Sequence, residues 1–139
     1  MAQHMAQQNA EGSRDLSTLV DASAELQHLA QTIWRLRQPD GCPWDREQTH
    51  QSIGKNMIEE AYEALDCIEA DDVAHLREEL GDVLMQVVLH AQIAADAGEF
   101  TLADVARDID TKLIRRHPHV FGDADADNPD EVLKIWDEV

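Results

Sequence analysis

Residues 76–94 read LREELGDVLMQVVLHAQIA, and their apolar side chains recur every three or four positions. This spacing puts them on one face of an α-helix and predicts a helix from about Asp72 to Ala97. Asp71 or Asp72 can cap its beginning, because an Asp side chain accepts hydrogen bonds from the free backbone N–H groups there. Gly98 is suited to its end, since glycine adopts the left-handed backbone that often terminates helices.

The same periodicity continues on both sides of this stretch. It predicts helices at residues 16–37, 49–69 and 101–116, and a short last helix from about residue 129. Residues 38–43 and Pro118 interrupt the pattern, because proline lacks the backbone donor that a helix interior needs. We therefore expect an all-α fold in which four main helices pack as a bundle. Residues 1–15 are polar and aperiodic, so we expect a disordered leader there and one helical domain over residues 16–139.

The charge balance of the chain restricts its partners. Its 139 residues include 29 Asp and Glu against 11 Lys and Arg, a formal net charge of −18. Such a chain lacks the basic surface that nucleic-acid polymers or anionic membranes would require. No apolar run approaches the roughly 18–20 residues of a membrane span, and no signal-peptide pattern opens the chain, so we expect a cytoplasmic protein. Cys42 and Cys67 form no disulfide framework and lack the CxxC spacing of a zinc site.

Acidic side chains recur in pairs on two of the expected helices. Glu60 and Glu63 form one pair, and Glu79 and Asp82 form the other. At about 100° per residue, the members of each pair lie about 60° apart on one helix face. Two antiparallel neighbouring helices can thus converge four carboxylates on one point, which suits a hard divalent cation such as Mg²⁺.

A solvated helix face is the alternative interpretation of these acids. Glu60 and Glu63 lie roughly opposite Ile58 and Leu65, as a surface helix would have them. Against this, Glu59 crowds onto the same segment, where few Lys or Arg side chains can neutralise the charge. Like charges this close are unfavourable without a cation, which favours the metal interpretation.

Two other clusters allow both a functional and a structural interpretation. Lys112, Arg115 and Arg116 suit the negative end of a helix dipole, and they equally suit the charge of a triphosphate. In the loop that contains Trp44, the indole ring can stack on a nucleobase while Asp45 or Gln48 hydrogen-bonds its edge. Taken alone, Trp44 is better interpreted as an anchor packed under the loop.

Three stretches together resemble one family. They are CPWDREQTHQSIGKNMIEEAYEALDCIE (42–69), LREELGDVLMQVVLHAQIA (76–94) and KLIRRHPHVFGD (112–123). In this order and spacing they resemble MazG, the all-α nucleoside triphosphate pyrophosphohydrolases, from about Leu26 to Trp136. The resemblance implies Mg²⁺-dependent hydrolysis between the α and β phosphates, with Mn²⁺ able to substitute, to give a monophosphate and pyrophosphate in nucleotide-pool house-cleaning. It also implies a homodimer of helical bundles related to the dimeric dUTPases, or a larger assembly.

The resemblance also assigns roles to single residues. The residues matching the metal ligands of the family are Glu60, Glu63, Glu79 and Asp82. The catalytic candidates are Glu63 and Glu59, of which Glu59 orients the attacking water or holds a second ion. The substrate-binding candidates are Lys112, Arg115 and Arg116 for the triphosphate, and Trp44, Asp45 and Gln48 for the base and sugar. The alternative is a catalytically inactive helical module that dimerises or senses nucleotides, because many family members carry two such domains and this chain holds one.

Overall fold

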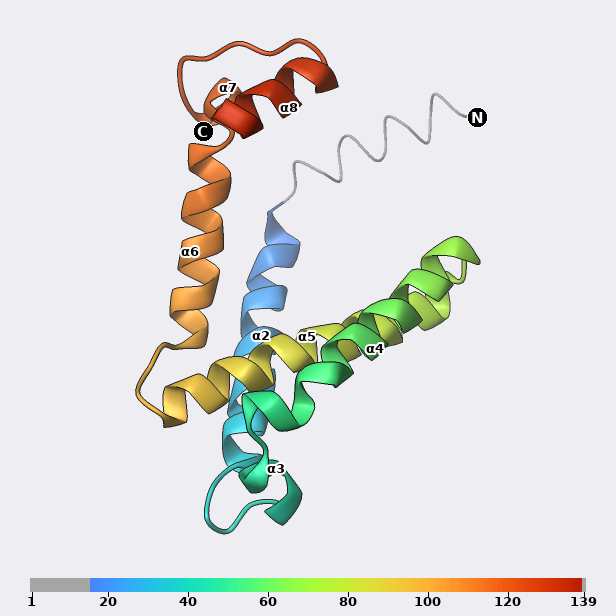
Figure 1. Cartoon of the computed structure of the whole chain (residues 1–139), viewed down its shortest axis with the longest axis vertical. Helices are drawn as coiled ribbons and strands as arrows, with labels where there is room; N and C mark the ends of the chain where they lie inside the picture. The colour runs from blue at the N-terminus through green and yellow to red at the C-terminus, as the bar shows by residue number, and fades with distance from the viewer. Residues whose placement is uncertain (1–15, 139) are drawn as a thin grey trace. The chain divides into compact units, whose positions relative to one another are not determined.

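The structure is a computed structural model that describes residues 16–138, and within that range it contains helices and no strand (Figure 1). The helices are α2 (Ser17–Leu36), α3 (Pro43–Glu47), α4 (His50–Glu69), α5 (Val73–Asp96), α6 (Leu102–Arg115), α7 (Pro118–Phe121) and α8 (Pro129–Glu138). The predicted all-α fold class is confirmed. The leader expected at residues 1–15 lies outside the described residues.

All four long helices begin and end within one residue of their predicted bounds. Threonine capping boxes set two of the beginnings. The Thr49 hydroxyl accepts a hydrogen bond from the Ser52 N–H at 3.1 Å, and the Ser52 hydroxyl accepts one from the Thr49 N–H at 2.9 Å. Thr101 and Asp104 make the same reciprocal pair at the beginning of α6. Each box satisfies two backbone donors that a helix N-terminus would otherwise leave free.

The connection between α4 and α5 is a tight reversal. Asp71 adopts a left-handed backbone with φ of 52°, and the Asp72 N–H donates to the Cys67 carbonyl at 2.9 Å. This bond closes the Schellman motif that ends α4. Asp72 then caps α5 by accepting from the His75 N–H at 3.2 Å. The reversal makes α4 and α5 run antiparallel side by side (Figure 1). It thereby brings their acidic pairs close together.

The predicted end of α5 at Gly98 is also confirmed. Gly98 has φ of 70°, and the Glu99 N–H donates to the Ala94 carbonyl at 2.9 Å, which is a second Schellman motif. The short helices α3 and α7 were not expected. Each begins with a proline, Pro43 or Pro118, at a position where the missing N–H has no helical partner to lose.

The chain divides into two compact units, one up to Leu89 and one from His90. Packing of all four main helices as one bundle would involve both units and stays a prediction. Among the described residues, the buried apolar side chains are Ile33, Ile53, Ala64, Val88 and Leu89 in the first unit, and Ala91, Ile93 and Ala94 in the second.

Both cysteines are free thiols. Among the described residues, no helix combines the length and the apolar composition that crossing a membrane requires.

Candidate active site

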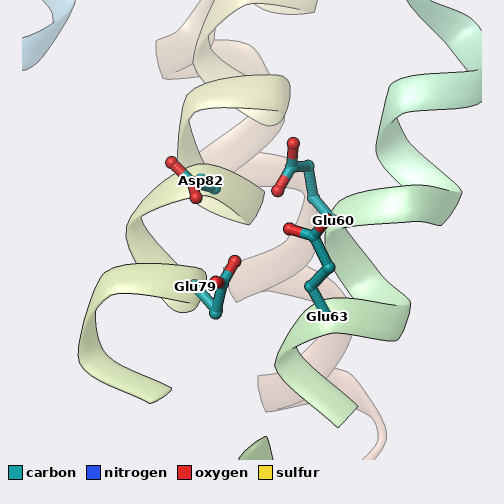
Figure 2. Close-up of side chains that lie close together, drawn as sticks. All are labelled: Glu60, Glu63, Glu79 and Asp82. Atoms are coloured by element: carbon teal, nitrogen blue, oxygen red, sulfur yellow. The ribbon is translucent and has the colours of Figure 1, made fainter. Parts of the chain in front are cut away.

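Four carboxylates from α4 and α5 converge within the first unit. Glu60 and Glu63 project from α4, and Glu79 and Asp82 project from α5 toward them (Figure 2). One carboxylate oxygen from each residue lies within 4.8 Å of the corresponding oxygen of every other. We call these four residues the acid quartet. The two pairs singled out from the sequence are therefore brought together at one point.

Glu60 lies on the more buried side of α4, whereas a solvated acidic face would leave it exposed. Glu60 of the acid quartet is half-buried, as are Glu79 and Asp82, whereas Glu63 is exposed. On the other side of α4, Ile58 is 62% exposed and Leu65 is 41% exposed. Glu60 shares its side of α4 with the buried Ile53 and Ala64. The side that carries Ile58 and Leu65 is open, so the solvated-face interpretation of Glu60 is wrong.

The acid quartet is electrostatically strained. Burial, followed by hydrogen bonding to Glu63 and repulsion from the neighbouring carboxylates, raises the pKa of Glu60 above its ordinary value of 4.5. The same causes in the same order raise the pKa of Glu79. Oε2 of Glu60 and Oε2 of Glu79 are both inaccessible and accept no hydrogen bond. Unpaired buried acceptors surrounded by like charges favour a positive ligand.

The donor set fits a divalent cation. Within residues 16–138, no member of the acid quartet forms an ion pair with a Lys, Arg or His side chain. Hard cations such as Mg²⁺ are bound through carboxylate oxygens and keep positions for water and phosphate, and the exposed Glu63 leaves one side of the group open to solvent. Glu59 is exposed on α4 and lies outside the quartet, although its charge contributes to the raised pKa of Glu60.

The basic segment lies in the second unit, at the end of α6. Lys112 and Arg115 are exposed in its last turn, and Arg116 follows as the half-buried C-cap. The Arg116 guanidinium stands over the ring of Trp136 in α8, 4.9 Å from the ring centroid, and its Nε has no hydrogen-bond partner. His117 meets the same ring edge-on at 5.6 Å. A cation–π contact thus holds one of the three cations, and solvent surrounds the other two.

Residues 48–121, which include the acid quartet and the basic segment, match the MazG nucleotide pyrophosphohydrolase domain. The chain belongs to this family. The matched range runs from the residue before the α4 cap to the end of α7, and it covers more than half of the chain.

Two curated relatives are named as nucleoside triphosphate pyrophosphohydrolases. The chain is 47% identical over 119 residues to the nucleoside triphosphate pyrophosphohydrolase/pyrophosphatase MazG of Thermotoga maritima, covering 86% of this chain and 45% of the relative. It is also 47% identical over 116 residues to a nucleoside triphosphate pyrophosphohydrolase of Escherichia coli K12, covering 83% of this chain and 44% of the relative. The chain therefore spans about half the length of these two curated relatives.

A solved MazG-related structure supports the fold. The crystal structure of a mazG-related protein from Thermotoga maritima matches with a TM-score of 0.67 and 27% sequence identity. The match covers 81% of this chain and 96% of that chain.

The segment that resembles the base and sugar site of MazG proteins lies in and beside α3. Trp44 is 56% exposed, so its interpretation as an anchor packed under the loop is wrong. Asp45 is half-buried in the same helix. The Gln48 side chain is already engaged, because its Nε2 donates to the Trp44 carbonyl at 2.8 Å and its Oε1 accepts from the Ser52 hydroxyl at 2.7 Å. In this structure Gln48 connects α3 to α4.

Sequence reasoning missed one buried polar residue on α5, the helix that carries Glu79 and Asp82. Gln86 of α5 is only 2% exposed, and its Oε1 accepts no hydrogen bond. The signal was an amide side chain inside the otherwise apolar run VLMQVVL, in the same helical register as Glu79 and Asp82.

Proposed function

We propose that this chain hydrolyses nucleoside triphosphates to the monophosphate and pyrophosphate, with Mg²⁺ as its cofactor and Mn²⁺ as a substitute. The observation that carries the proposal is the convergence of the four quartet carboxylates within 4.8 Å, without a compensating cationic side chain in the described part of the chain. Glu60, Glu63, Glu79 and Asp82 would hold the cation. Membership of the MazG family supplies the reaction class.

The chain's own residues have distinct tasks in this reaction. A divalent cation, when bound, supplies positive charge against the phosphate oxygens and activates water. Glu59 and Glu63 are exposed carboxylates at and beside the quartet on α4, so water from the solvent can reach them. We assign Glu59 the task of accepting the proton from the water whose oxygen is transferred to phosphorus as the α–β anhydride bond breaks. Pyrophosphate leaves as an anion, and no covalent intermediate with the protein is needed.

The basic segment provides the remaining positive charge. A nucleoside triphosphate carries about four negative charges at neutral pH, and phosphate oxygens are favoured partners of Arg and Lys. Lys112 and Arg115 are exposed and can form such contacts, while Arg116 is oriented by Trp136. We assign all three to the triphosphate, and Trp44, Asp45 and Gln48 to the base and sugar. The exposed ring of Trp44 supports a stacking role.

We also propose that the protein functions as a homodimer. The outward face of α4 forms an apolar groove of about 280 Å³, which is lined by Met57, Ile58, Ala61, Tyr62 and Leu65. Ile58 and Tyr62 are each 62% exposed there. An apolar helix face left open on a single chain usually marks an interaction surface, and a second copy of the chain is the occupant that the family resemblance implies.

The direct test is pyrophosphate release from a panel of nucleoside triphosphates with and without a divalent cation. Release that depends on the cation supports the proposal. Binding without release would instead favour a nucleotide sensor or an inactive helical module.

We further propose a cytoplasmic role in nucleotide-pool house-cleaning, which modified triphosphates in the same panel can test.

A further inference from the structure

Gln86 is a buried polar side chain with no evident structural task. It lies in the apolar part of α5, where it is 2% exposed. Its Oε1 is inaccessible and accepts no hydrogen bond from the described residues. A buried amide oxygen without a donor costs free energy, so a residue that only fills space at this position would be better as an apolar side chain.

The helical register connects Gln86 to the acid quartet. Gln86 follows Asp82 by four residues and Glu79 by seven, so it lies within about 40° of both around the helix axis. It is about 6 Å further along the axis than Asp82. Long side chains in a helix lean toward its N-terminus, which for Gln86 means toward the turn that contains Asp82.

Three buried side-chain oxygens on α4 and α5 accept no hydrogen bond. They are Oε2 of Glu60, Oε2 of Glu79 and Oε1 of Gln86. Ionised carboxylates accept hydrogen bonds and cannot donate them, so the quartet cannot satisfy Gln86 through its charged members. The described residues thus leave the Gln86 oxygen without a donor. Mg²⁺ keeps several of its waters when it binds to proteins, and such waters are strong donors.

We infer that Gln86 is a positioning residue of the cation site, whose Oε1 accepts a hydrogen bond from a water of hydration of the ion held by the acid quartet. This inference rests on the proposed function. In this role Gln86 orients the waters bound to the ion, while the quartet carboxylates contact the ion itself. Partners of this kind adjust metal affinity without contacting the metal.

Three substitutions separate this role from simple packing. Gln86→Met has nearly the same length and removes the acceptor, whereas Gln86→Glu has the same shape and retains it. Gln92→Met is the matched control, because Gln92 lies on the same helix and its amide donates to Asp96 at 2.8 Å. If Gln86→Met does not fold, Gln86→Asn, which withdraws the amide by one methylene, is measured in its place.

The experiment is titration of the full chain with Mn²⁺ alone, followed by electron paramagnetic resonance, alongside chemical unfolding in EDTA. We expect Gln86→Met to weaken Mn²⁺ binding about tenfold. Its stability in EDTA should be equal to or higher than that of the wild type, because an unpaired buried acceptor has been removed. Gln86→Glu should bind Mn²⁺ at least as tightly as the wild type, and Gln92→Met should bind it equally.

Each other outcome overturns the inference in a distinct way. If the wild type binds Mn²⁺ and Gln86→Met binds it equally well, the role of Gln86 is refuted while the proposed function stands. If Gln86→Met and Gln86→Glu both lose affinity together with stability in EDTA, Gln86 is a packing residue. If the wild type itself does not bind Mn²⁺, the cation site of the proposed function fails, and the role of Gln86 fails with it.

Discussion

Glu60 on α4 and Glu79 on α5 approach each other within 4.8 Å, and each buries one carboxylate oxygen that accepts no hydrogen bond. The two residues are brought together by the tight reversal between their helices. Burial and neighbouring charge raise the pKa of both. Two like charges this close destabilise the protein unless a proton or a cation neutralises them.

Loss of one quartet carboxylate should abolish most of the activity. Glu79→Gln keeps the size of the side chain but removes a negative oxygen ligand. We expect pyrophosphate release to fall about 100-fold or more, since removal of one electrostatic contact to developing charge typically costs this much. Circular dichroism should show unchanged helical content, because a buried charge has been removed and no apolar contact has been lost.

The neighbouring residue provides the control for this substitution. Glu78 is exposed on the same turn of α5, about 100° around the helix from Glu79. Glu78→Gln makes the same change in net charge and should leave the rate within about twofold of the wild type, as surface substitutions usually do. Equal losses in both variants would show that overall charge matters and that the quartet does not.

The stability of the metal-free protein should fall as the pH rises above 4.5. Because the folded-state pKa values of Glu60 and Glu79 are raised, the folded state holds more protons than the unfolded state between 4.5 and those values. The free energy of unfolding therefore decreases as the pH rises through this window. Urea unfolding in EDTA at a series of pH values measures this dependence of the free energy of unfolding on pH.

Two comparisons make this pH dependence diagnostic. Added Mg²⁺ should restore stability at neutral pH, because it binds the ionised carboxylates of the folded state. The double variant Glu60→Gln with Glu79→Gln should show a flatter profile in EDTA, since neither side chain can ionise. Wild-type stability that rises over the same pH range would contradict the electrostatic description of the quartet.

The pair Asp72 and His75 at the beginning of α5 should titrate as an ion pair. His75 Nδ1 lies 2.6 Å from an Asp72 carboxylate oxygen, which raises the pKa of His75 above its ordinary 6.5. Backbone and side-chain hydrogen bonds from His75 lower the pKa of Asp72 below 3.8. The stabilisation of the folded state by this ion pair is complete between pH 3.8 and pH 6.5, the ordinary pKa values of the two groups. It is lost as the pH rises through the folded pKa of His75 or falls through that of Asp72.

NMR titration of the His75 ring in the wild type and in Asp72→Asn checks this pair. Asn can still accept the hydrogen bond that caps the helix, but it carries no charge. The pKa of His75 should therefore return toward 6.5 in the variant. An unchanged His75 pKa would show that Asp72 is not its partner in solution.

The open apolar face of α4 should be the dimer interface. Ile58→Glu introduces a charge into the groove lined by Met57, Ile58, Ala61, Tyr62 and Leu65, and burial of an unpaired charge opposes association. We expect sedimentation to show that the variant dissociates at concentrations where the wild type is dimeric. Leu133→Glu is the matched control, because Leu133 of α8 is also 62% exposed. Equal dissociation in both variants would refute a specific role of the α4 face.

Local sequence signals predicted the helices and the pairing of the acids. Thr49, Thr101 and Gly98 are capping residues whose effect depends on nearby backbone, so their positions define helix ends without knowledge of the fold. The quartet could be anticipated because its pairs have i,i+3 spacing on helices joined by a short reversal. Pro43 and Pro118 were interpreted only as helix breakers, which is why α3 and α7 were missed.

Burial was the property that the sequence did not predict. The periodicity of α4 is the same whether its acidic or its apolar face turns inward, and only contact with α5 shows that Glu60 is the inward side. Trp44 was expected to be packed and is exposed, while Gln86 is buried within an apolar run. In each case the outcome depends on contacts between segments, which local patterns do not contain.

The central claim is that the acid quartet supports cation-dependent pyrophosphohydrolysis. The most direct measurement is pyrophosphate release by the purified chain from canonical, deoxy and modified nucleoside triphosphates, with Mg²⁺, with Mn²⁺ and with EDTA. We expect release of one pyrophosphate per monophosphate formed with at least one substrate, sustained by either cation and abolished by EDTA. Release that is undiminished in EDTA, or no release from any triphosphate with either cation, would contradict it.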